Sequence, residues 1–296
     1  MSFAKLPEEL LREILAYALY VPHDEFCRPP ALDPAVASEK PASKKKRKAS
    51  RAGLLLVSKR WLRVGTPLLY ECLRLSRRKH ARLVTKVLQE NPRLGNAVRC
   101  LRLEGAYSKK LADVVKLTPR VRTLYIDVDV DASQRINGLL KALPLLNPEN
   151  LFLRDCSRTP DTRKREICAA IADAISDRTW SLLKTYTNLH CAPMTSRLAS
   201  ALRRAPSLRE LVIQASEANQ WLAAGYMQKI VKNRGLRQIS CQVVSSSDQT
   251  HRKILPCRLD EKQLSDRAKQ LFVFEPHNAP IEANPGSRAL RECNTQ

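Results

Sequence analysis

VRCLRL at residues 98–103 and VRTLYI at residues 121–126 share one spacing of apolar residues, apolar-x-x-apolar-x-apolar, from which the fold of the chain follows. Because side chains alternate across a strand, the last two apolar positions point to one face of a short strand. The same spacing recurs at irregular steps of 23 to 35 residues, which indicates a degenerate repeat. Seven short strands are therefore expected, centred on Leu73, Leu101, Leu124, Leu151, Tyr186, Leu211 and Ile239.

Helices are expected between these strands, because apolar residues recur there at three- and four-residue spacing. A unit of one strand and one helix cannot bury both apolar faces alone, so neighbouring units must stack. The predicted fold class is α/β, a curved solenoid with strands inside and helices outside. A doubly wound α/β sheet is the alternative, and it would need more consistently apolar strands. The helix stripes are Leu83, Val84 and Val87; Leu111, Val114 and Val115; Ile136, Leu139, Leu140 and Leu143; Ile167, Ile171 and Ile175; Leu198 and Leu202; and Leu222, Tyr226 and Ile230.

The last strand candidate is QLFVFE at 270–275, around Leu271 and Val273. Beyond Pro276 the composition becomes polar and rich in proline, so residues 276–296 are expected to form a flexible tail. The repeat domain is then predicted to span 76–275.

The first helix is predicted from KLPEELLREILAYAL at residues 5–19. Pro7 suits the first helical position because its missing N–H has no partner there, and Glu8 and Glu9 place negative charge at the positive end of the helix dipole. One broad apolar stripe needs a partner; it contains Leu10, Leu11, Ile14, Leu15, Ala18 and Leu19.

Two more short helices are predicted from GLLLVSKRWLRVGTPLLYECLRL at residues 53–75. Leu55, Leu56, Val57 and Trp61 follow helical spacing. Thr66 is expected to cap the second of these helices, with Pro67 at its first position.

Taken together, LPEELLREIL and LVSKRWLRVGTPLLYECLRL resemble the F-box, a three-helix module, and the match covers about residues 6–20 and 53–75. The second stretch is similar to fungal F-box proteins. The F-box domain would span 4–75. In that family the apolar edge of the module docks on the Skp-type adaptor of SCF ubiquitin ligases, and through it on the cullin. The alternative is that the helices merely cap the following domain. The resemblance implies that the residues that meet the adaptor or shape the docking edge are Leu6, Pro7, Leu10, Ile14, Leu15, Val57 and Trp61.

Residues 21–52 are rich in proline and lack periodicity, so they are predicted to be a disordered basic insertion in that module. Such an insertion costs only about 1 kcal/mol of loop-closure entropy over a short loop. Its run KKKRK, formed by Lys44, Lys45, Lys46, Arg47 and Lys48, resembles a monopartite nuclear localisation signal. Basic runs are also frequent in solvated loops. A nuclear location, a cytoplasmic one, or both are expected.

The repeats resemble the leucine-rich repeat family, although the asparagine position of that repeat is not consistently present. The resemblance implies a concave face that binds a protein substrate through outward-pointing strand residues. The expected substrate-binding residues are Arg102, Tyr125, Asp127, Phe152, Arg154 and Glu210, and the same row holds Glu104, Thr185, Thr187, Gln214, Gln238 and Gln242.

Composition narrows the function classes. At 296 residues with 44% hydrophobic residues the chain can bury a sizeable core, and neither a signal peptide nor an apolar run of about 18 residues is expected. The nine cysteines show no C-x-x-C spacing, which argues against a disulfide framework and against a zinc site. The net charge of +23 attracts nucleic acid, acidic proteins or anionic lipid, but the 5% aromatic content is low for a single-strand-binding face.

Catalytic motifs are not evident. Asp127, Asp129 and Asp131 mimic three ligands of an EF-hand, but Ala132 and Gly138 stand where that loop requires Gly and Glu. A strand end with Val128 and Val130 inward is preferred. We therefore expect a non-enzymatic adaptor that needs no cofactor or metal. It is expected to act as a monomer within a ligase complex, to bind a protein substrate and not to bind membranes. The runner-up is a basic nuclear scaffold that binds nucleic acid or chromatin.

Overall fold

The computed structural model describes residues 6–22, 26, 51–105, 107–130, 135–155, 161–189, 192–242 and 265–274. The predicted nuclear signal at 44–48 and the predicted tail at 276–296 lie outside these residues. No helix among the described residues is long and apolar enough to cross a membrane.

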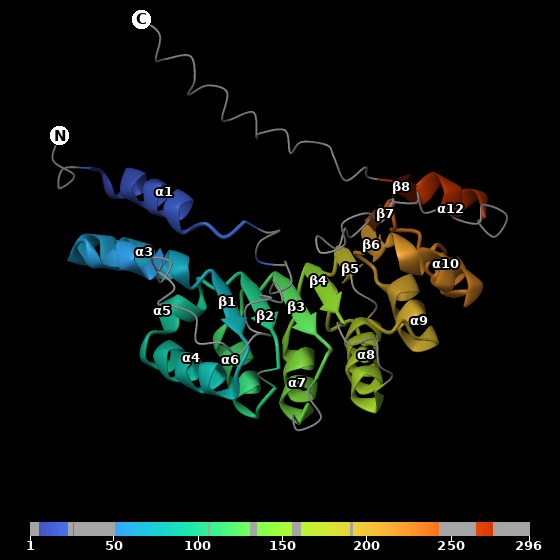
Figure 1. The fold of residues 1–296 in the computed structure, drawn as a ribbon, viewed down its shortest axis with the longest axis horizontal. Helices are drawn as coiled ribbons and strands as arrows, with labels where there is room; N and C mark the ends of the chain where they lie inside the picture. Colours follow the sequence, from blue (N-terminus) through green and yellow to red (C-terminus); the bar gives the residue numbers. More distant parts are fainter. Residues whose placement is uncertain are drawn as a thin grey trace, which may run out of the picture.

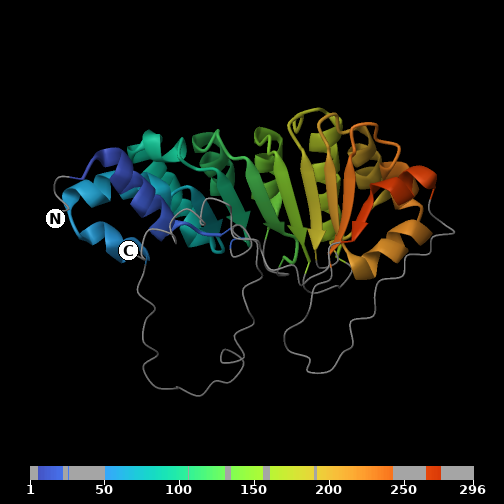
Figure 2. The same ribbon diagram turned by 90° about the horizontal axis from the view of Figure 1, so that it is seen from above.

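The described residues form one sheet of eight parallel strands, whose spatial order is the same as their order along the chain. The sheet curves from one end of the molecule to the other (Figures 1 and 2). Consecutive pairing requires every crossover to advance by one strand, as in a solenoid. The strands are β1 (Cys72–Leu75), β2 (Cys100–Leu103), β3 (Thr123–Asp127), β4 (Asn150–Arg154), β5 (Thr185–Leu189), β6 (Glu210–Gln214), β7 (Gln238–Gln242) and β8 (Phe272–Phe274).

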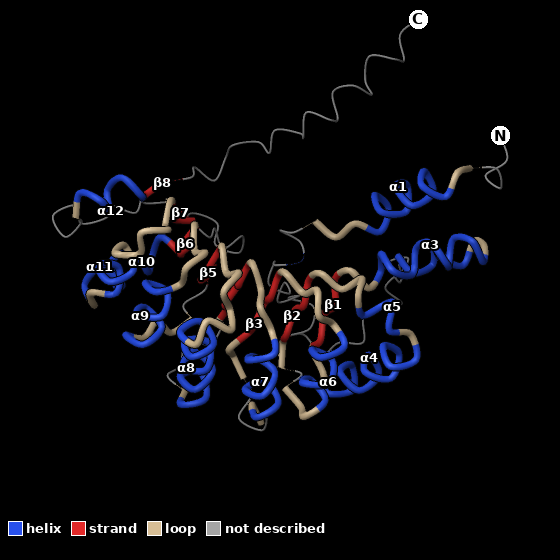
Figure 3. The backbone as a smooth tube through the Cα atoms, turned by 180° about the vertical axis from the view of Figure 1, so that it is seen from behind, coloured by secondary structure: helices blue, strands red, loops and turns tan. Residues whose placement is uncertain are grey.

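The helices between the strands line one side of the curved sheet (Figures 1 and 3). This one-sided arrangement confirms the α/β strand-helix solenoid and excludes a doubly wound sheet, which carries helices on both faces. The helices are α4 (Arg78–Glu90), α5 (Pro92–Gly95), α6 (Lys110–Leu117), α7 (Asn137–Ala142), η3 (Leu143–Leu145), α8 (Thr162–Ser176), α9 (Ser196–Arg204), α10 (Ala215–Ala223), α11 (Tyr226–Ile230) and α12 (Asp266–Leu271).

The seven predicted strand centres form one continuous row across the sheet. Each pairs in register with the next, from Leu73 at β1 to Ile239 at β7, and all are buried against the helices. At β8 the row ends on Phe272, which pairs with Ile239. The last strand thus lies within the predicted stretch 270–275 and contains Val273, whereas Leu271 ends α12.

Among the helices of the repeat units, the apolar stripe predicted for α4 differs from the structure. In α4 the buried side chains are Ala81, Thr85 and Leu88, whereas Leu83 is 62% exposed. The helix turns Ala81 and Thr85 toward the sheet. The buried Thr85 hydroxyl donates a hydrogen bond to the Ala81 carbonyl oxygen at 2.8 Å. A count of apolar residues cannot anticipate a core face that includes alanine and threonine.

A helical segment precedes the sheet. It contains α1 (Glu8–Leu19), η2 (Arg51–Leu56) and α3 (Lys59–Leu69), and α1 and α3 lie side by side at one end of the molecule (Figures 1 and 3). Its own small core consists of Leu11, Leu15, Leu19 and Leu55. Gly65 of α3 sits where a Cβ would come within 2.3 Å of a Leu55 methyl group and 3.3 Å of a Leu15 methyl group, so glycine permits the close approach.

The predicted split of residues 59–69 into two helices was wrong. The Ser58 hydroxyl accepts from the Trp61 N–H at 3.2 Å and caps one continuous helix, α3. Thr66 does not cap a new helix, because its hydroxyl donates back to the Leu62 carbonyl at 2.5 Å. Pro67 lies inside the last turn, where the helix tolerates one missing hydrogen bond just before it ends.

The prediction that residues 21–52 form a disordered insertion needs correction where residues of this range are described. Phe26 is buried and its carbonyl accepts from the Arg102 guanidinium, 76 residues away. At the other end, Arg51 and Ala52 belong to η2. Residues 27–50 lie outside the described residues.

Candidate partner-binding surfaces

Helix α1 carries two apolar stripes rather than the single broad one predicted. Leu11, Leu15 and Leu19 recur at four-residue spacing and pack into the chain's own core. Leu10 and Ile14, each 47% exposed, follow the same spacing on another side of the helix, with Tyr17 one turn further. Only one of the two stripes finds a partner within the described residues.

Large exposed apolar side chains gather on the N-terminal helices. Of the eleven in the described part of the chain, eight belong to α1, η2, α3 or the residues that adjoin them. We call six of these the N-terminal apolar surface. Its residues are Leu10, Ile14, Tyr17, Leu56, Val57 and Leu62.

The predicted adaptor-binding residues divide into three groups. Leu10, Ile14, Val57 and Pro7 are exposed. Leu6 and Trp61 are half-buried against the small core, and Leu15 is fully buried in it. Leu15 can therefore hold α1 in place but cannot touch another protein.

Sequence analysis missed three members of the N-terminal apolar surface. Tyr17 follows Ile14 by three residues, so the helical spacing could have revealed it. Leu56 and Leu62 flank Val57 and could not be assigned while the helix boundaries there were wrong. Their exposure follows from the position of Ser58, which starts α3 between them.

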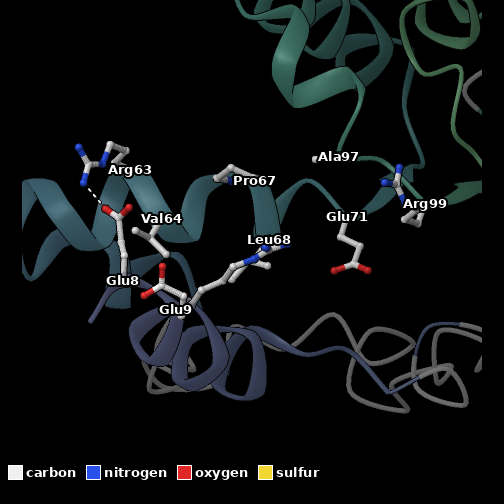
Figure 4. Close-up of a pocket in the computed structure, with 10 residues that line it drawn as sticks. Glu8, Glu9, Arg63, Val64, Pro67, Leu68, Glu71, Ala97 and Arg99 are labelled. Atoms are coloured by element: carbon white, nitrogen blue, oxygen red, sulfur yellow. Dashed lines mark hydrogen bonds and ion pairs between the residues drawn. The ribbon is translucent and has the colours of Figure 1, made fainter. Parts of the chain in front are cut away.

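A groove of about 650 Å³ lies between α1, α3 and the residues that precede β1 and β2 (Figure 4). Glu8 and Arg63 form an ion pair across it, and Glu71 and Arg99 line the part near the sheet. Its lining also includes the apolar residues Val64, Pro67 and Leu68. The lining of the groove thus carries both signs of charge.

The face of the sheet opposite the helices carries the residues predicted to point outward. Arg74, Arg102, Tyr125, Phe152 and Thr187 pair in register from β1 to β5. The alternation was therefore read correctly. Exposure was not, because Arg102 is only 2%, Tyr125 3% and Arg154 8% exposed.

Neighbouring side chains on this face bury one another. The carboxylate of Glu104 accepts from Arg74 Nε and from Arg102 Nε, both at 2.7 Å. The Arg102 guanidinium carbon lies 4.3 Å from the centroid of the Tyr125 ring, a cation–π contact. With the Phe26 carbonyl as a further acceptor, Arg102 is held on three sides.

The contacts on this face continue through Tyr125, Arg154 and Asp127. Burial raises the pKa of Tyr125 to about 12, against the opposing charges of Arg154 and Arg102. Arg154 Nη1 lies 3.6 Å from Asp127 Oδ2. Burial also raises the pKa of Asp127 to about 6, although the Asp129 N–H, 3.0 Å from Asp127 Oδ1, and Arg154 both favour the ionised form.

A buried lysine lies beside the aspartates that follow β3 and β4. Lys164 of α8 lies 2.5 Å from Asp155 and 3.8 Å from Asp129. The cations of Arg154 and Lys164 thus occupy the neighbourhood of the aspartates that superficially resemble calcium ligands, and Asp131 lies outside the described residues. No group of three possible metal ligands occurs among the described residues. Sequence reasoning missed Lys164 because it projects from a helix rather than from a strand.

The remaining predicted substrate residues are more accessible. Phe152 and Glu210 are half-buried, and Glu210 Oε2 lies 3.3 Å from the Thr185 hydroxyl. We call Arg74, Arg102, Glu104, Tyr125, Asp127 and Arg154 the charged ladder. The charged ladder lies on β1 to β4. Phe152 of β4 and Glu210 of β6 belong to the same face of the sheet.

Comparison with models of known protein families and with curated proteins gives no match for this chain.

Proposed function

We propose that this protein is a non-enzymatic substrate-recognition adaptor of an SCF-type ubiquitin ligase. The N-terminal helices would dock on a Skp-type adaptor, and through it on a cullin. The open face of the sheet would hold a protein substrate. One observation carries the proposal: α1 uses Leu11, Leu15 and Leu19 within its own chain and exposes a second stripe at Leu10 and Ile14.

The second stripe suits a protein partner on energetic grounds. Scattered exposed leucines are ordinary on a monomer, but apolar residues gathered on neighbouring elements are typical of interaction sites. Full burial of a leucine or isoleucine contributes about 1.5–3 kcal/mol. Because the small core already fixes α1 against α3, little conformational entropy remains to be lost when a partner covers the stripe.

The resemblance of 6–20 and 53–75 to the F-box supports the identity of this partner. The observed segment order supports it as well, since α1, η2 and α3 directly precede β1. The apolar stripe belongs to α1 and the polar face belongs to the strands, so the two proposed binding sites lie on different elements. A ligase adaptor needs this separation, because both partners must be bound at once.

The substrate half of the proposal rests on the charged ladder. Arg102 and Glu104 are held by their mutual contacts and are largely buried. They therefore shape the face and are poorly placed to contact a substrate directly. The Arg74 side chain is 52% exposed, and Phe152 and Glu210 are half-buried. These three are the better candidates for direct substrate contact, and a substrate of mixed polar and apolar character fits them.

Co-purification of a Skp-type adaptor with paired variants tests the docking half. Leu10→Ala together with Ile14→Ala should reduce recovery of the adaptor at least about tenfold, because two interface side chains lose about 1.5–3 kcal/mol each. The matched control is Leu83→Ala with Leu182→Ala, two exposed leucines that lie outside the N-terminal helices, and it should bind like the wild type.

Circular dichroism of each variant separates lost binding from lost folding. The exposed Leu10 and Ile14 contribute little to the core, so helix content and melting temperature should stay close to those of the wild type. Undiminished adaptor recovery with the folded double variant would refute the proposed docking surface.

A further inference from the structure

Cys72 and Cys100 lie directly opposite each other at the first positions of β1 and β2. Adjacent strands are about 4.8 Å apart, which falls within the Cα separation of about 4.4–6.8 Å found in disulfides. Register partners on parallel strands point to the same face of the sheet. The two thiols can therefore meet without a change in strand pairing.

Both thiols are accessible to a small molecule. Cys72 and Cys100 are partly exposed, whereas Cys168 and Cys241 are buried. The pair lines a cavity of about 230 Å³ whose walls also include Tyr20, Phe26 and Leu69. A cavity of this size admits a hydroperoxide but leaves little room for a large reductant.

The surroundings distinguish the two sulfurs. The Cys72 thiol donates a hydrogen bond to Cys100, and the Thr123 hydroxyl supports it, so the pKa of Cys100 is lowered despite burial and the charge of Glu71. Because the thiolate is the reactive form, Cys100 is the better nucleophile. Burial raises the pKa of Cys168 to about 12, which keeps that thiol inert.

We propose that Cys72 and Cys100 form an oxidisable dithiol that hydroperoxides convert into a disulfide between β1 and β2. The Cys100 thiolate attacks one peroxide oxygen: an S–O bond forms, the O–O bond breaks, and the departing alkoxide or hydroxide takes up a proton. Cys72 then attacks the Cys100 sulfenic acid: the S–S bond forms, the S–O bond breaks, and water leaves with the Cys72 proton. Two thiols are oxidised by two electrons and one peroxide is reduced to an alcohol, or to water, with one further water released.

This modification site is independent of the proposed ligase function. The disulfide would tie the first strand after α3 to the second repeat unit, at the wall of a cavity that α1 also lines through Leu19 and Tyr20. Oxidation therefore acts at the junction between the helical segment and the sheet.

The test is peptide mapping of the full chain after hydrogen peroxide. Treated protein is alkylated with iodoacetamide and digested with trypsin without reductant. The expected product joins peptide 64–74 to peptide 100–102, two hydrogen masses lighter than their sum, and it disappears with dithiothreitol. A variant with serine at the cysteines outside the described residues removes competing thiols; these are Cys27, Cys156, Cys191, Cys257 and Cys293.

Single variants identify the attacking sulfur. In Cys72→Ser, a sulfenic acid should accumulate at Cys100 and react with dimedone, whereas Cys100→Ser should give at least about tenfold less label at Cys72. The unmodified chain is mapped in parallel, so the result does not depend on the folding of the serine variant. Absence of the linked peptide in folded protein, or equal dimedone labelling in the two single variants, would overturn the inference.

Discussion

The Asp127 carboxylate lies in surroundings that change its acidity. Its side chain is 15% exposed, and it is balanced by Arg154 at 3.6 Å and by the Asp129 N–H. Burial outweighs both, so the pKa rises from 3.8 to about 6. The ionised form of Asp127 is therefore costly to the fold at neutral pH, and perturbed carboxyl groups of this kind are frequent at functional sites.

As the pH rises from about 4 to about 6, the contribution of Asp127 to the free energy of unfolding should consequently fall. The folded state holds the Asp127 proton more tightly than the unfolded state, so the contribution is present at low pH and is lost as pH rises through about 6. The loss should amount to at most about 3 kcal/mol. Urea unfolding of Asp127→Asn across this range should show a correspondingly flatter pH dependence than the wild type.

The control for this measurement is Asp177→Asn, which alters an exposed aspartate at the end of α8. Any change in the pH dependence that this variant shares with Asp127→Asn is then a general effect of removing one negative charge. Parallel curves for the wild type and Asp127→Asn would show that the Asp127 carboxyl is not perturbed by burial.

Sequence patterns predict the direction of a strand side chain better than its exposure. Arg102 and Tyr125 were placed on the correct face because alternation is a property of the local backbone. Their burial was missed because it depends on residues distant in sequence, such as Phe26, and on the stacking of one side chain upon the other. Lys164 was missed because it belongs to a helix, and its partners Asp129 and Asp155 come from loops after two strands.

Among the elements, helix α7 illustrates how tightly the repeat units stack. A Cβ built on Gly138 would lie 2.0 Å from the Ser108 carbonyl oxygen and 2.5 Å from that of Tyr107. Both obstacles are backbone atoms, so they cannot rotate away as a side chain would. The position requires glycine for close approach.

Gly138→Ala should destabilise the protein by about 1–3 kcal/mol, the usual cost of overpacking, although alanine favours helices. The matched control is Gly53→Ala in η2, where no atom lies within 4 Å of the added Cβ, and its stability should be within about 1 kcal/mol of the wild type. Urea denaturation measures both. Equal midpoints for the two variants would contradict the described packing of α7.

The boundaries of elements were predicted correctly where the apolar spacing is regular. They were predicted wrongly where a possible cap and a proline lie inside a helix. The row from Leu73 to Ile239 was predicted in full, because a buried parallel strand leaves a strong pattern. The pair Thr66–Pro67 suggested the start of a new helix, yet the cap at Ser58 and the packing of Gly65 favour one continuous helix. The exposed stripe of α1 was hidden because both stripes are equally apolar.

The whole molecule carries a net charge of +23, which favours weak binding to nucleic acid whatever its function. If the protein is a ligase adaptor, this binding should ignore sequence and fall at least about tenfold between roughly 50 and 150 mM salt, because it depends on counterion release. Fluorescence anisotropy with two unrelated oligonucleotides measures it. Tight binding that distinguishes the oligonucleotides and survives the higher salt would favour the scaffold function instead.

The most direct measurement is isothermal titration calorimetry of the full chain with a purified fungal Skp-type adaptor. The proposal predicts one-to-one binding with a negative heat capacity change, because apolar residues such as Leu10 and Ile14 become buried. The affinity should change little between about 50 and 150 mM salt, since the interface is largely apolar. Absence of binding heat with both proteins folded, at concentrations of about 100 μM, would contradict the assignment of the N-terminal helices as an adaptor-docking module.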